Sequence, residues 1–245
     1  PHDVEVIEQV NKITDIAQVK ISKDDSGITF LGKEMDKTYI DRVKSLSMNN
    51  GYIERHKDLK IVYTPLHGTG ITVVPAALKA YGFENVFVEE HQAIPDGNFP
   101  TCLSPNPENP EALEAGLRKA KEVDADILLA TDPDADREAI AVKTSSGEWV
   151  LFNGNQTATL FTYYLLERWQ QEHKLTGKQF VIKTIVTSEM VRKVADSFNV
   201  HCYDTLTGFK HIAAKIKSLE GREEYIGGGE ESFGYLIGDF VRDKD

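Results

Sequence analysis

Short apolar runs alternate along the chain with segments whose apolar residues recur at helical spacing. The apolar runs predict strands at residues 60–64, 85–90, 127–131, 138–143, 179–186, 200–204 and 224–228. The helical spacing predicts helices at residues 3–17, 36–48, 71–81, 110–122, 154–170, 188–198 and 209–219. Strands and helices in such alternation are typical of α/β proteins with mainly parallel sheets.

The alternation runs once through residue 143 and begins again near residue 150. We therefore predict two consecutive α/β domains, each with a mainly parallel mixed sheet flanked by helices. Residues 36–150 would form the first and residues 151–245 the second. Residues 20–35 are mixed in character, contain glycine and are expected to be a connector.

Composition narrows the class of protein. The net charge of −11 argues against a nucleic-acid-binding surface, which needs clustered lysine and arginine. No apolar run approaches the roughly 20 residues that a membrane-spanning helix requires. Two cysteines, Cys102 and Cys202, cannot form a disulfide framework, so a cytoplasmic location is expected. Because the chain starts with Pro1 and ends on RDKD, we expect a fragment or a processed chain.

Three aspartates leave the end of the strand at 127–131 together, in the sequence DPDADR. Asp132, Asp134 and Asp136 would repel one another unless a cation lay among them, and a set of carboxylates suits Mg²⁺ or Ca²⁺. Arg137 adds a planar donor suited to a phosphate group. The alternative is a solvated acidic turn. We call residues 132–137 the acid loop.

Three further loops carry candidate chemistry. His67–Gly70 joins a strand to a helix and would either cradle an anion or form a tight turn with a structural histidine. Residues 205–210 offer hydroxyls, a glycine and a lysine. Residues 227–234, the glutamate loop, surround Glu230, Glu231 and Ser232 with glycines, and we expect the charges to face solvent or a polar ligand such as a sugar. The alternative for both loops is ordinary turn chemistry.

Taken together, five motifs in this order resemble the α-D-phosphohexomutases, the phosphoglucomutase and phosphomannomutase family. They are TPLHGTG at 64–70, DPDADR at 132–137, TGFK at 207–210, GEESFG at 229–234 and RDKD at 242–245. The resemblance implies the second and third of four domains, with residues 1–35 as a tail of the first. It also implies an enzyme that interconverts hexose 1-phosphate and hexose 6-phosphate through a phosphoserine and a hexose bisphosphate.

The resemblance assigns roles to individual residues. Asp132, Asp134 and Asp136 would bind Mg²⁺, and Arg137 would face the phosphoserine and the substrate as the catalytic arginine. Thr207, Glu230 and Ser232 would contact sugar hydroxyls and Lys244 a sugar or phosphate oxygen, with Lys210 as a further candidate. The family's Ser-His-Asn-Pro phosphoserine loop is missing, because the similar segment at 104–107 reads SPNP. The fragment is therefore expected to be inactive without the first and fourth domains.

Other classes remain open at this point. A haloacid-dehalogenase-like phosphatase would use Asp132 as nucleophile, although Asp136 stands where such enzymes usually have Thr or Val. A calcium-binding EF-hand loop starting at Asp132 would need Gly and Glu where the chain has Arg137 and Lys143. A catalytically silent sugar-phosphate-binding protein is the third alternative.

Overall fold

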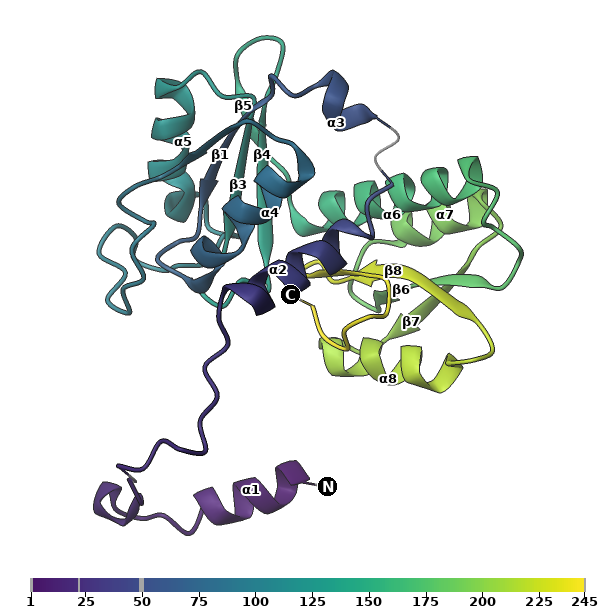
Figure 1. Ribbon diagram of the computed structural model, residues 1–245. Helices are drawn as coiled ribbons and strands as arrows, with labels where there is room; N and C mark the ends of the chain where they lie inside the picture. The colour runs from purple at the N-terminus through teal and green to yellow at the C-terminus, as the bar shows by residue number, and fades with distance from the viewer. Residues whose placement is uncertain (1, 22, 49–50, 245) are drawn as a thin grey trace. The chain divides into compact units, whose positions relative to one another are not determined.

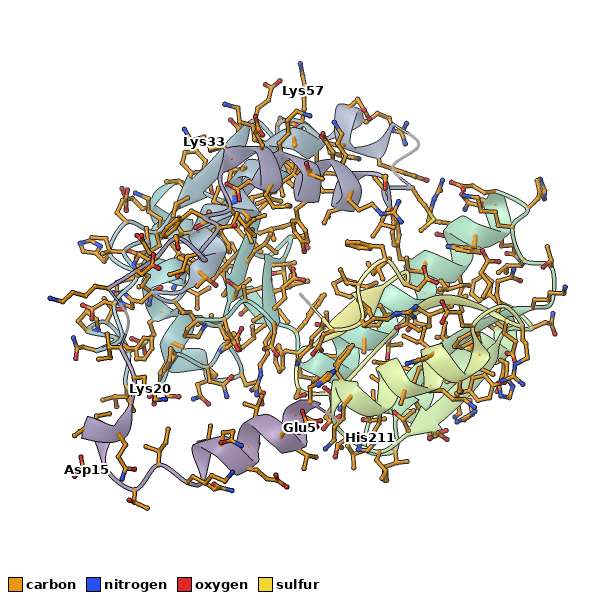
Figure 2. The ribbon with its side chains drawn as sticks, turned by 60° about the horizontal axis from the view of Figure 1, so that its bottom comes forward. Glu5, Asp15, Lys20, Lys33, Lys57 and His211 are labelled. Carbon is orange, nitrogen blue, oxygen red and sulfur yellow. The ribbon has the colours of Figure 1, made fainter. Side chains whose placement is uncertain are left out.

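The computed structural model describes residues 2–21, 23–48 and 51–244, which fall into two units, residues 1–37 and 38–245. The first unit holds the helix α1 (His2–Val10) and the short helix η1 (Ile16–Gln18). In Figure 2, Glu5 marks α1 and Asp15 marks the start of η1, where its carboxylate accepts the amide of Ala17 at 2.8 Å. The predicted helix at 3–17 therefore ends early, at Val10, and every described residue of α1 is exposed.

The second unit contains two sheets (Figure 1). The first sheet has the strand order β2-β1-β3-β4-β5, in which β2, β1 and β3 are parallel and β4 and β5 are antiparallel to their neighbours. Its strands are β1 (Lys60–Thr64), β2 (Asn85–Val88), β3 (Ile127–Thr131), β4 (Glu138–Lys143) and β5 (Trp149–Leu151). Its helices are α2 (Lys33–Lys44), which begins in the first unit, α3 (Tyr52–Arg55), η2 (Thr69–Thr72), α4 (Val74–Tyr81), η3 (Pro110–Leu113) and α5 (Glu114–Glu122).

The second sheet has the order β7-β6-β8-β9, with β9 antiparallel to β8 and the others parallel. Its strands are β6 (Gln179–Thr184), β7 (His201–Thr205), β8 (Glu224–Gly229) and β9 (Tyr235–Ile237). Figure 1 shows α6 (Gly154–Gln171) and α7 (Glu189–Ser197) on one side of this sheet and α8 (Phe209–Leu219) on the other. The prediction of two α/β units with mainly parallel mixed sheets is confirmed.

The central strand β6 shows why this layering is stable. All six of its residues are buried, and successive side chains of a strand point to opposite faces. Val181 packs in the core beneath α6 and α7, while Phe180 and Ile182 pack in the core beneath α8. Each fully buried side chain of this size contributes about 1.5–3 kcal/mol to folding, so β6 fixes both layers and the position of the loops at its end.

Several helices and strands begin or end at residues other than those predicted. The helix predicted at 71–81 becomes α-helical only at Val74, because residues 69–72 form a 3₁₀ turn. The helix predicted at 36–48 spans Lys33–Lys44. The strand predicted at 179–186 ends at Thr184, whose carbonyl accepts the amide of Thr187 in a turn. The three-residue strands β5 and β9 were not predicted. Within the described residues, every helix is too short or too polar to cross a bilayer.

Candidate functional site

The acid loop begins where the parallel strand β3 ends at Thr131. The carboxylates of Asp132, Asp134 and Asp136 each place an oxygen within 4.8 Å of the other two. Asp132 is buried, Asp136 half-buried and Asp134 exposed, so the cluster opens toward solvent on one side. An oxygen-only set of this size fits a hard divalent cation such as Mg²⁺ or Ca²⁺.

Asp132 is held in place by the backbone of its own loop. Its Oδ1 atom accepts the amides of Asp136 at 3.0 Å and Arg137 at 3.1 Å. Burial and, to a smaller extent, the negative charges of Asp134 and Asp136 raise the pKa of Asp132 to about 6, against the opposing effect of the Arg137 amide. The loop thus gathers negative charge that a cation would stabilise.

Two cationic side chains of the chain flank this cluster. The Arg137 guanidinium pairs through Nη1 with Glu108 Oε1 at 2.9 Å and lies 3.7 Å from Asp132 Oδ2 through Nε. The Lys244 Nζ atom lies 3.3 Å from Asp136 Oδ2 and 3.9 Å from Glu230 Oε2. Lys244 therefore connects the acid loop with the glutamate loop.

The glutamate loop begins in the last three residues of β8 and carries Glu230, which is buried. Its Oε1 atom accepts the amide of Gly208 at 2.6 Å, which brings the loop at 205–210 to the same place. Gly234 leaves room for Lys244, because an added Cβ would lie 2.5 Å from Lys244 Cδ. Phe233 has a φ of 67° and accepts the amide of Glu138 at 3.0 Å through its carbonyl. A backbone hydrogen bond therefore joins the glutamate loop to the first residue of β4, directly after the acid loop.

The remaining candidates lie nearby but less enclosed. Thr207 and Lys210 are exposed on either side of Gly208 and Phe209, and Ser232 is half-buried in the glutamate loop. Their side chains are thus at least partly accessible to solvent. The contacts bring together the acid loop, Glu230 and Lys244. Thr207 and Lys210, the second residue of α8, are placed near Glu230 only by the Gly208 amide that lies between them in the sequence.

Glu231 corrects the expectation that both glutamates face solvent or a polar ligand. Its Oε2 atom accepts the hydroxyls of Thr184 at 3.1 Å and Thr187 at 3.0 Å, and its amide donates to the Thr187 hydroxyl. Glu231 therefore contacts the turn at the end of β6, whereas Glu230 contacts Gly208 and Lys244. Glu231 anchors the loop to the scaffold.

The sequence analysis missed one residue of the site and left the role of one turn open. Glu108 lies in a proline-rich loop and carries no local signal of its pairing with Arg137. At His67–Gly70, the amides of Gly68 and Thr69 donate to the carbonyls of Pro65 and Pro133. These amides are already used within the protein, which disfavours an anion cradle at this turn and favours a structural role.

Family models match nearly the whole second unit. The description "phosphoglucomutase/phosphomannomutase, alpha/beta/alpha domain II" matches residues 37–147, and the corresponding domain III matches residues 153–245. A phosphoglucomutase of Staphylococcus haemolyticus is 40% identical over 188 residues, which are 77% of this chain and 34% of that protein. The chain thus spans about a third of the length of this relative.

Solved structures show the same fold. A phosphoglucomutase/phosphomannomutase family protein from Burkholderia thailandensis superposes with a TM-score of 0.60 at 22% identity, covering 88% of this chain and 47% of that one. An N-acetylphosphoglucosamine mutase from Aspergillus fumigatus, solved in complex with GlcNAc-6P and magnesium, gives a TM-score of 0.53 at 15% identity. It covers 74% of this chain and 36% of that one.

Proposed function

Because the chain belongs to the phosphoglucomutase/phosphomannomutase family, we propose that it supplies the metal-binding and sugar-recognition parts of a phosphohexomutase. We assign residues 36–150 to the metal-binding domain and residues 151–245 to the sugar-recognition domain. The reaction would interconvert hexose 1-phosphate and hexose 6-phosphate. The observation that carries this proposal is Lys244, which contacts both a carboxylate of the acid loop and Glu230 of the glutamate loop.

The acid loop would hold Mg²⁺ through Asp132, Asp134 and Asp136. The clustering of their oxygens and the raised pKa of Asp132 support this assignment, as does the magnesium named for the Aspergillus enzyme. When bound, the ion would neutralise charge on the transferred phosphoryl group. Asp132 would keep its ligand geometry through the two amides that its Oδ1 atom already accepts.

Arg137 would act as the catalytic arginine by orienting phosphate oxygens. Its side chain is 36% exposed, so its donors can reach a ligand at the mouth of the cluster. A guanidinium presents parallel N–H groups that match a phosphate. Glu108 would hold the guanidinium until a phosphate group takes the place of the Glu108 carboxylate, because the two anions compete for the same N–H donors of Arg137.

The sugar would be bound by Thr207, Glu230 and Ser232, with Lys244 on a sugar or phosphate oxygen. A mutase must accept its bisphosphate in two orientations, so these residues would contact hydroxyls that occupy similar places in both. A buried carboxylate such as Glu230 suits this task, because a hydroxyl donating to a charged acceptor forms a strong hydrogen bond.

The phosphoserine that donates the phosphoryl group would come from another part of a longer enzyme, as would the residues that bind the second phosphate. We propose that the 245 residues alone are inactive and need the first and fourth domains as partners. A cytoplasmic location agrees with the two free thiols, Cys102 and Cys202.

Covalent labelling distinguishes a mutase from a haloacid-dehalogenase-like phosphatase. Asp132 Oδ1 already accepts two amides, so a nucleophilic Asp132 would have to attack the phosphorus through Oδ2. Labelling of Asp132 by a phosphate mimic would support the phosphatase, and absence of labelling together with Mg²⁺ binding would support the mutase.

The test uses Asp134→Ala in the full-length enzyme that carries this chain, with Asp196→Ala on the exposed side of α7 as the matched control. Loss of a charged ligand is expected to lower kcat by about a hundredfold or more, while the control keeps its rate. A near-normal rate for Asp134→Ala would contradict the role of the acid loop. Full mutase activity of the isolated chain would contradict its dependence on other domains.

A further inference from the structure

The segment Leu66–Gly70 packs directly against the middle of the acid loop. We propose that this segment is a template that sets the spacing of the Asp132 and Asp134 carboxylates, and that its residues are positioning residues for the metal. The inference rests on the proposed metal-binding function. The segment would then act neither as an anion cradle nor as a simple turn, but as a support that positions the acid loop.

Gly68 lies directly against Pro133, the residue between the two aspartates. A Cβ added to Gly68 would lie 2.3 Å from Pro133 Cα and 2.5 Å from the Pro133 carbonyl oxygen. The backbone φ of Gly68 is −106°, which any residue can adopt. Glycine is therefore required here for the close approach of two backbones and not for an unusual conformation.

Thr69 orients the peptide that links Pro133 to Asp134. Its amide donates to the Pro133 carbonyl at 2.8 Å, and its hydroxyl donates to the same oxygen at 3.1 Å. Two hydrogen bonds to one carbonyl fix the plane of that peptide and so the direction in which Asp134 leaves the backbone. Asp134 itself is exposed and gains its orientation from this peptide.

Gly70 places the same segment against the end of β3. An added Cβ would lie 2.3 Å from Tyr63 Oη, 2.7 Å from Thr131 Oγ1 and 3.5 Å from Ala135 Cβ. Tyr63 Oη and Thr131 Oγ1 are 2.8 Å apart and share a hydrogen bond. Gly70 thus packs against Thr131, the residue that precedes Asp132, and against Ala135 of the acid loop. Together with Gly68 at Pro133, the segment contacts the chain on both sides of Asp132 and Asp134.

The template is itself held in a strained conformation. Leu66 and His67 have φ values of 47° and 62°, in the left-handed region that is unfavourable for residues other than glycine. Both residues are buried. The His67 ring is held between the Ile94 carbonyl and the Thr101 hydroxyl, each at 2.9 Å. Burial and hydrogen bonds thus hold Leu66 and His67 in an unfavourable backbone conformation. This is expected if the acid loop depends on the shape of the segment.

The experiment measures Mg²⁺ affinity of the 245-residue chain by titration calorimetry for Gly68→Ala and Thr69→Val. Gly97→Ala is the matched control, because a Cβ there meets nothing within 4 Å, and Thr69→Ser restores the hydroxyl. Altering residues that orient metal ligands typically weakens affinity by about 10–100-fold. We expect Gly68→Ala to fall in this range and Thr69→Val near its lower end, with Gly97→Ala and Thr69→Ser within about twofold of the parent.

A second readout needs no metal. The amides of Asp136 and Arg137 donate to Asp132 Oδ1, so their hydrogen exchange in the metal-free chain reports the loop geometry. Exchange should be faster in Thr69→Val than in Thr69→Ser. Thr69→Val decides the question if Gly68→Ala does not fold by circular dichroism.

The outcomes separate the two proposals. Affinity and exchange equal to the parent in folded Thr69→Val would overturn the template. A parent chain that binds no Mg²⁺ at millimolar concentration would overturn the proposed metal site, and the exchange rates would then support or overturn the template by themselves.

Discussion

Lys244 Nζ lies 3.3 Å from Asp136 Oδ2, so the chain places a cation of its own against a carboxylate of the acid loop. Only 10% of the Lys244 side chain is exposed, and water therefore screens this pair weakly. The ammonium offsets part of the repulsion among the three aspartates. It also competes with any metal ion for Asp136.

Replacing Lys244 by methionine is therefore expected to tighten Mg²⁺ binding. Removing a positive charge close to the metal position relieves repulsion between two cations, and a gain of about 1 kcal/mol corresponds to roughly a fivefold gain in affinity. Calorimetric titration of the chain measures the effect. Lys217→Met, an exposed lysine of α8, is the control. Unchanged or weaker Mg²⁺ binding in Lys244→Met would contradict the competition.

Glu108→Gln tests the pairing that holds Arg137. The pair joins two side chains that are each 36% exposed, and exposed pairs contribute only about 0–1 kcal/mol to stability. We therefore expect an almost unchanged urea midpoint but several-fold tighter binding of glucose 1-phosphate, because the carboxylate no longer competes for the guanidinium. Glu111→Gln in the neighbouring turn is the control. A large loss of stability without any change in ligand binding would show that the pair is structural.

Glu231→Ala is expected to lower the free energy of unfolding by about 1–3 kcal/mol, because it removes the acceptor of the Thr184 and Thr187 hydroxyls. Glu231→Gln keeps an acceptor oxygen and should recover most of the loss. Urea unfolding compares the two variants with the parent. Equal stability of the alanine variant and the parent would exclude an anchoring role for Glu231.

Stability is expected to decrease at high pH. Burial raises the pKa of the Tyr63 hydroxyl to about 12 and that of the Cys202 thiol to about 11. Both groups stay neutral in the folded protein to a higher pH than in the unfolded chain. Their full contribution to the free energy of unfolding is therefore present below about pH 9 and is lost as the pH rises from 9 to 12. At pH 11 the raised pKa of Tyr63 alone should lower the free energy of unfolding by about 1 kcal/mol relative to pH 8.

Tyr63→Phe checks this dependence. The variant should be less stable than the parent at pH 8, because it lacks the hydrogen bond with Thr131. Its urea midpoint should nevertheless fall less between pH 8 and pH 11. Tyr163→Phe, at an exposed position, should follow the parent. Parallel decreases in parent and Tyr63→Phe would show that Tyr63 does not cause the alkaline loss.

The elements that the sequence predicted are those whose signal is contained in one continuous segment. The strand β3 and the acid loop are an example, because an apolar run passes directly into three aspartates. The short strands β5 and β9 lie at the edges of their sheets and exist through pairing with β4 and β8. Three residues carry too little periodicity to indicate such pairing.

The contacts of the site depend on residues that are distant in sequence, and local patterns do not contain them. Arg137 pairs with Glu108, and Lys244 reaches back to Asp136. Glu230 and Glu231 also have different partners, Gly208 and Thr184, although both lie in the same glycine-rich segment. Motif resemblance assigned roles to individual residues, and the fold showed which of those residues contact one another.

The hydrogen bond from the Glu138 amide to the Phe233 carbonyl, 3.0 Å long, has a consequence for substrate selection. Glu138 directly follows Arg137, and Phe233 directly follows Ser232. The separation between Arg137, the proposed phosphate contact, and Ser232, the proposed hydroxyl contact, is therefore constrained by a hydrogen bond between main-chain atoms. Substitution of side chains in either loop would change which chemical groups are recognised, while this main-chain hydrogen bond would still set the distance between the two contacts.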